Sequence, residues 1–85
     1  MSLISEFKAD GFIVLALEQT PRSVELQTYA PDSDTVLIVG NEVEGVDSQV
    51  LKACDQVLAI PMAGQKESFN VAAAAAMALY HLKFP

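Results

Sequence analysis

Polar residues and glycines gather in three turns of the sequence, and each turn follows a short run of apolar residues. The turns span residues 18–21, 40–45 and 61–70. They contain the carboxylates of Glu42 and Glu44 and the hydroxyl and amide groups of Ser68 and Asn70. Such groups could position a ligand or move a proton. Each also has a structural explanation, because glycines form turns and Ser or Asn caps helices.

Short apolar runs must position these turns. Residues 12–17, 35–39 and 56–60 are bulky and lack polar alternation, which is typical of strands buried on both faces in a parallel sheet. Asp47 or Ser48 can cap a short helix through Ala53, and residues 70–82 have high helix propensity. Residues 22–29 fit either a short helix or an irregular turn, and residues 1–3 are expected to lie outside the fold.

The order of these elements predicts an α/β domain with three strands in this chain. In a parallel sheet the carboxyl ends of the strands lie at one edge, and ligands bind just beyond that edge. The three turns are therefore predicted to form one composite site.

Composition limits the kinds of protein this chain can be. Its 85 residues allow one small domain, and a hydrophobic fraction of 52% excludes a disordered tail. The net charge of −6 argues against RNA or DNA binding by this chain's own charge. No apolar run approaches the roughly 18 residues of a membrane span, and no signal-peptide pattern opens the sequence. A lone cysteine forms no internal disulfide, which suggests the cytoplasm.

The single reactive side chains have structural explanations. Cys54 is expected to be a small core residue, because no base or orienting group accompanies it. His81 falls in the last turn of the predicted final helix, where a cation suits the helix dipole. With one Cys and one His the sequence offers no metal-ligand spacing, and it contains no phosphate-binding glycine motif. No metal site is expected.

The last two turns together are more specific than either alone. Residues 36–46 read Val-Leu-Ile-Val-Gly-Asn-Glu-Val-Glu-Gly-Val, and residues 60–71 read Ile-Pro-Met-Ala-Gly-Gln-Lys-Glu-Ser-Phe-Asn-Val. In order and spacing they resemble the motifs G-x-E-x-x-G and I-P-M-x-G-x-x-x-S-L-N-V of the SpoU/TrmH branch of the SPOUT methyltransferases. The resemblance covers residues 12–83, which is most of the chain.

This resemblance implies both an activity and a fold. SpoU/TrmH enzymes methylate the 2′-hydroxyl of a ribose in tRNA or rRNA with S-adenosylmethionine, by direct attack of the ribose oxygen on the methyl group. Their domains are α/β, with a parallel sheet and a C-terminal trefoil knot that would span residues 36–83 here. A helix that passes through a tight loop needs small side chains, and the alanine run 72–76 supplies them. Relatives dimerise partly through the last helix, so a homodimer is expected.

Site residues follow from the same resemblance. The cofactor would contact residues at the three turns, namely Leu17, Thr20, Gly40, Ile60, Met62, Gly64, Ser68 and Phe69. The catalytic candidates are Glu42 and Asn70, which would position the RNA or an arginine that the family uses. Phe69 stands where the family has leucine, a change that reshapes the floor of the cofactor pocket.

The family's arginine motif is absent from this sequence. That motif carries an asparagine and a catalytic arginine before the first strand, whereas Arg22, the sole arginine, follows it. Residues 1–85 are therefore expected to be the C-terminal part of a methyltransferase domain. The isolated chain is expected to be inactive, with RNA bound through parts missing from it.

Two alternatives compete with this interpretation. The chain could be a non-catalytic cofactor-binding or dimerisation module of α/β type that lost the arginine motif. It could also be a flavodoxin-like or receiver-type binding domain whose turns match by chance, although the receiver type requires an acidic pair after its first strand.

Overall fold

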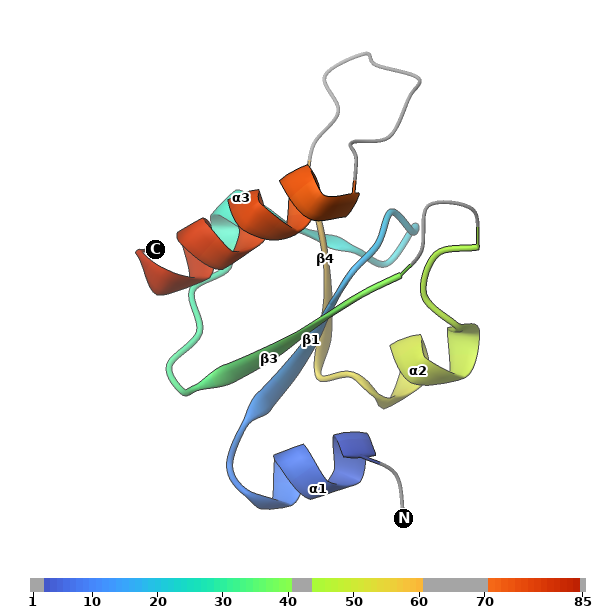
Figure 1. Cartoon of the computed structure of the whole chain (residues 1–85), viewed down its shortest axis with the longest axis vertical. Coiled ribbons are helices and arrows are strands. Elements are labelled where there is room, and N and C mark those ends of the chain that lie inside the picture. The colour runs from blue at the N-terminus through green and yellow to red at the C-terminus, as the bar shows by residue number, and fades with distance from the viewer. Residues whose placement is uncertain (1–2, 41–43, 61–70, 85) are drawn as a thin grey trace.

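Strand β1 (Ile13–Leu17) is paired on both of its sides in a parallel sheet. It pairs with β3 (Thr35–Val39) and with β4 (Gln56–Ala59), and β2 (Val24–Glu25) extends the sheet beyond β4. The order is β2-β4-β1-β3 in this computed structural model. Figure 1 shows the strands with the helices around them. The structure describes residues 3–40, 44–60 and 71–84.

Burial of β1 explains its unbroken apolar sequence. Val14, Leu15 and Ala16 are completely buried, so successive side chains on both faces of the strand are shielded from water. β4 ends in the buried Leu58 and Ala59. The three predicted strands and the α/β class are therefore confirmed within the described residues.

Helices lie on both sides of the strands. They are α1 (Leu3–Ala9), α2 (Ser48–Ala53) and α3 (Val71–Lys83), together with the one-turn 3₁₀ helix η1 (Leu26–Thr28). In Figure 1, α3 lies on the opposite side of the strands from α1 and α2. The Asp47 carboxylate caps α2 by accepting the Gln49 N–H at 2.8 Å, as one of the two predicted caps. No helix in the described ranges is long and apolar enough to cross a membrane.

Three features of the fold differ from the sequence predictions. Leu3 begins α1, although residues 1–3 were expected outside the fold. The described sheet has one strand more than the three predicted, because Val24 and Glu25 pair with β4. Residues 22–29, predicted as either a short helix or an irregular turn, do contain a short helix, η1, but they also form β2, which neither alternative included. A two-residue strand leaves no periodicity in sequence, which is why it escaped prediction.

The core joins the sheet to α3. Leu15, Leu26, Leu58 and Ala78 form one buried cluster. Ala78 is the contact from α3, and its small side chain lets the helix backbone approach the sheet closely. Near the helix end, the His81 Nε2 lies 2.8 Å from the Tyr29 carbonyl oxygen. That contact requires a proton on Nε2 and gives His81 a structural role.

Asp55 closes the amino end of the β1–β4 pair. Its backbone N–H donates to the Val14 carbonyl at 2.7 Å, and its Oδ2 accepts the Val14 N–H at 2.8 Å. The Lys8 ammonium lies 3.7 Å from Asp55, but both side chains are well exposed, so this ion pair contributes little stability. The amino ends of these strands are thus held by the two hydrogen bonds between Asp55 and the Val14 main chain, one of which uses the Asp55 carboxylate.

Candidate functional site

The carboxyl ends of β1, β3 and β4 meet at one edge of the sheet, called here the carboxyl edge (Figure 1). Leu17, the last residue of β1, is the register partner of Val39 in β3 and of Leu58 in β4. Gly40 directly follows β3, and Ile60 directly follows β4. The prediction of a shared edge is confirmed for the turn after β1 and for the described ends of the turn after β3, whereas the third turn, residues 61–70, lies outside the described residues.

Two glycines bring the ends of the turn after β3 into contact. A Cβ atom at Gly40 would overlap the main chain of Gly45 and Val46. Gly45 has a φ of +71°, which is strained for residues with a side chain. The turn therefore needs glycine at both positions for its own backbone packing.

Glu18 links this turn to the end of β1. Its Oε2 accepts the Val46 N–H at 2.8 Å, and its Oε1 accepts the Gln19 N–H at 3.2 Å. The same carboxylate lies where a Cβ atom at Gly45 would be. Sequence reasoning missed Glu18, because a glutamate after a strand gives no sign that it reaches a turn 28 residues later.

Hydroxyl groups close the turn after β1. Ser23 Oγ donates to the Glu18 carbonyl at 2.6 Å and accepts the Thr20 N–H at 3.0 Å. Ser23 and Thr20 hydroxyls are 2.9 Å apart. Because the single Ser23 hydroxyl proton goes to Glu18, the Thr20 hydroxyl must donate to Ser23. Thr20 Oγ1 also accepts the Arg22 N–H at 3.2 Å, so one of its lone pairs has no partner among the described residues.

The predicted site residues divide into two groups. Leu17, Gly40 and Ile60 are brought together at the carboxyl edge, and Thr20 lies in the turn that continues from β1. The remaining six lie outside the described residues: Glu42, Met62, Gly64, Ser68, Phe69 and Asn70.

Other reactive groups lie away from this edge. Cys54 directly follows α2 and precedes β4, so it lies toward the amino end of the sheet. Burial raises the pKa of its thiol above the usual value, with a smaller opposing effect of Lys8, and this reduces its nucleophilic thiolate form. Within the described ranges, no three His, Cys, Asp or Glu side chains are placed to hold a metal ion.

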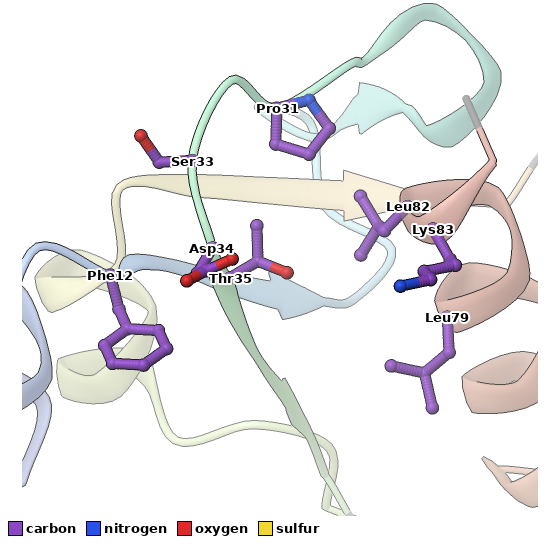
Figure 2. Close-up of a pocket in the computed structure, with 8 residues that line it drawn as sticks. All are labelled: Phe12, Pro31, Ser33, Asp34, Thr35, Leu79, Leu82 and Lys83. Atoms are coloured by element: carbon purple, nitrogen blue, oxygen red, sulfur yellow. The ribbon is translucent and has the colours of Figure 1, made fainter.

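A pocket of about 420 Å³ lies at the other end of β3. Figure 2 shows Leu79, Leu82 and Lys83 of α3 on one side of it and Phe12 and Thr35 on the other. Thr35 is the first residue of β3, so this pocket is remote from the carboxyl edge. Its walls are an open mixture of apolar and exposed polar side chains, without converging chemical groups.

Comparisons with known proteins agree with the motifs. The sequence model of the SpoU rRNA Methylase family matches residues 1–80. The chain is 44% identical over 85 residues to the 23S rRNA (guanosine(2553)-2′-O)-methyltransferase RlmP of Bacillus subtilis, an alignment that covers 96% of this chain and 33% of that protein. The chain spans about a third of the length of three bacterial relatives that it matches, 33–36%.

Solved structures share the fold over most of the chain. The Aquifex aeolicus TrmH/SpoU tRNA modifying enzyme superposes with a TM-score of 0.81 and 36% identity, over 92% of this chain and 40% of that one. The SpoU methyltransferase AviRb from Streptomyces viridochromogenes, in complex with AdoMet, superposes with a TM-score of 0.76 and 27% identity. That superposition covers 92% of this chain and 30% of the other.

The Glu18–Gly45 contact predicts a difference between two glycine substitutions. Gly11 also has a positive φ, +92°, but a Cβ atom there would meet nothing within 4 Å. Gly11→Ala should therefore cost only backbone strain, about 1–2 kcal/mol of unfolding free energy. Gly45→Ala should cost more, because its Cβ also displaces the Glu18 carboxylate. Urea unfolding followed by circular dichroism measures both.

A double substitution isolates the side-chain contribution. In a Glu18→Ala background the carboxylate is gone, so Gly45→Ala should cost no more than Gly11→Ala does. If Gly45→Ala still lowers the unfolding free energy more than Gly11→Ala does in the Glu18→Ala background, the contact between Glu18 and Gly45 is not the cause of the difference.

Proposed function

The chain belongs to the SpoU rRNA Methylase family, and from this premise we propose that it supplies the S-adenosylmethionine-binding part of an enzyme that methylates ribose 2′-hydroxyls in tRNA or rRNA. The observation that carries the proposal is the carboxyl edge, where Leu17, Gly40 and Ile60 come from three neighbouring parallel strands. Ligands of parallel α/β sheets bind beyond such an edge. The AdoMet complex of a SpoU methyltransferase with the same fold supports this choice of cofactor.

The described residues at the carboxyl edge suit a nucleoside cofactor. Leu17 and Ile60 are half-buried apolar side chains that can pack against a purine ring. The main chain at Gly40 is uncovered by a side chain, and Thr20 Oγ1 can accept one hydrogen bond. When bound, S-adenosylmethionine supplies a methyl group on a positively charged sulfur.

Sequence motifs extend the proposed site beyond the described residues. We assign Met62, Gly64, Ser68 and Phe69 to the cofactor pocket together with the four residues above, and Glu42 and Asn70 to catalysis as groups that position the RNA or an arginine. Residues 36–83 are proposed to form a trefoil knot. Residues 1–85 are proposed to be the C-terminal part of the methyltransferase domain.

RNA binding is proposed to depend on parts of the protein other than this chain. The net charge of −6 repels a polyanion. The basic side chains are distributed over α1, the turn after β1, α2, the segment before α3, and α3, as Lys8, Arg22, Lys52, Lys66 and Lys83. No arginine matches the family's catalytic motif, so the isolated chain is proposed to bind cofactor without methylating RNA. A cytoplasmic location is proposed on the same basis, since tRNA or rRNA is the proposed substrate.

Cofactor binding should depend on the carboxyl edge and not on the pocket near the start of β3. Ile60 and Leu82 are both half-buried and both pack against the core, so their truncation to alanine should destabilise the chain similarly. Ile60→Ala should weaken the binding of S-adenosylhomocysteine by about five- to ten-fold, through loss of apolar contact. Leu82→Ala should leave the affinity unchanged. Isothermal titration calorimetry on the folded chain measures both.

Absence of heat with about 1 mM ligand and folded wild-type chain would contradict the proposed cofactor site. If Ile60→Ala and Leu82→Ala weaken S-adenosylhomocysteine binding equally, the loss of affinity reflects reduced folding stability and not a lost contact with the ligand. Binding in the chain together with inactivity of the whole protein would favour the non-catalytic module.

A homodimer is proposed from an exposed apolar surface on α3. Tyr80 and Phe84 are 69% and 63% exposed, and their rings lie 5.2 Å apart. Met77 and Leu79 extend the exposed apolar area. Such surfaces on a small domain commonly mark association sites.

Charged substitutions on this surface should produce monomers. The double substitution Tyr80→Lys with Phe84→Lys should lower the molar mass measured by light scattering to that of a monomer. Leu3→Lys, at a 66% exposed apolar position of α1, is the matched control and should leave the dimer intact. A wild-type chain that is monomeric at high concentration would rule out the dimer.

A further inference from the structure

The Glu18 carboxylate joins two of the turns at the carboxyl edge. Its Oε2 accepts the Val46 N–H at 2.8 Å, in the turn after β3, while Oε1 accepts the Gln19 N–H at 3.2 Å in its own turn. Both carboxylate oxygens therefore hold main-chain donors. Hydrogen bonds to a charged acceptor are stronger than neutral ones, and this one is shielded by the half-buried position of Glu18.

The main chain of Glu18 is also fixed. Its N–H donates to the Leu58 carbonyl of β4 at 2.9 Å, and its carbonyl accepts the Ser23 hydroxyl at 2.6 Å. Glu18 thus contacts β4, its own turn and the turn after β3. The carboxylate projects from a backbone that the sheet holds in place, so it can act as a fixed support.

Contacts continue from Glu18 to Gly40. The carboxylate lies against Gly45, whose main chain in turn lies against the α-carbon of Gly40. Neither Gly40 nor Gly45 has room for a Cβ atom. A shift of the Gly45–Val46 backbone would therefore be transmitted to Gly40, the residue that directly follows β3.

We propose that Glu18 is a positioning residue for the cofactor site. It sets the place of the Gly40 main chain relative to Leu17 and Ile60, and through this it sets the affinity for S-adenosylmethionine, an inference that rests on the proposed function. The carboxylate acts through Gly45 and Val46, without a contact to the cofactor.

Two measurements on the full chain test this role. The first is amide hydrogen exchange of Val46 by NMR without ligand, and the second is the affinity for S-adenosylhomocysteine by calorimetry. Glu18→Ala should speed Val46 exchange by about ten-fold or more and weaken the ligand by a similar factor, because a charge-assisted hydrogen bond is lost. Glu18→Gln should fall between wild type and Glu18→Ala, since its amide oxygen can still accept the Val46 N–H.

Glu6→Gln, on the exposed side of α1, removes the same charge away from the edge and should change neither measurement. If the Glu18 variants speed exchange equally at Val46 and at the buried Leu15, the effect is global and the positioning role is wrong. Wild-type affinity in folded Glu18→Ala would also overturn it, while the proposed function would stand. A wild-type chain that binds no ligand would instead refute the proposed function, and the positioning role with it.

Discussion

The pairing of β1 on both sides determines where chemistry can occur in this chain. Because Val14, Leu15 and Ala16 are buried, the middle of the sheet has no place for an unpaired polar group. Polar side chains are restricted to the strand ends. There two acids perform the same task, since Asp55 and Glu18 each accept a main-chain N–H from a segment distant in sequence.

The two ends of the sheet nevertheless differ in what they can do. At the amino end, Asp55 and Val14 satisfy each other, and the nearby pocket is lined by an open mixture of side chains. At the carboxyl end, parallel strands deliver several turns to one edge, and Glu18 holds two of them together. Among the described residues of this edge, closely packed main chain predominates, which suits the proposed recognition of a cofactor that brings its own reactive methyl group.

Close packing at this edge also explains the distribution of glycine. Gly40 and Gly45 are glycine because the turn's own backbone and the Glu18 carboxylate occupy the space of a side chain. The same two glycines therefore form the turn and shape the proposed cofactor site. The proposed cofactor contact at Gly40 is thus part of a turn whose shape depends on the absence of side chains.

Sequence patterns predicted the features that depend on local composition. The runs 12–17, 35–39 and 56–60 predict the strands because each is apolar except, at most, at its first position, and the alanine-rich segment predicts α3. The parallel order of these strands predicted that the turns after them would share one edge of the sheet. The pairing of Val24 with β4 and the reach of Glu18 to Val46 were missed, because both depend on contacts between segments that only the folded topology brings together.

The central claim is that the carboxyl edge binds S-adenosylmethionine. NMR of the isotope-labelled chain, titrated with S-adenosylhomocysteine, tests it at single residues. We expect the amide signals of Leu17, Gly40 and Ile60 to shift together with one affinity, while the signals of Thr35 and Lys83 at the opposite pocket stay in place. Shifts confined to Thr35 and Lys83, or none at the carboxyl edge at saturating ligand, would contradict it.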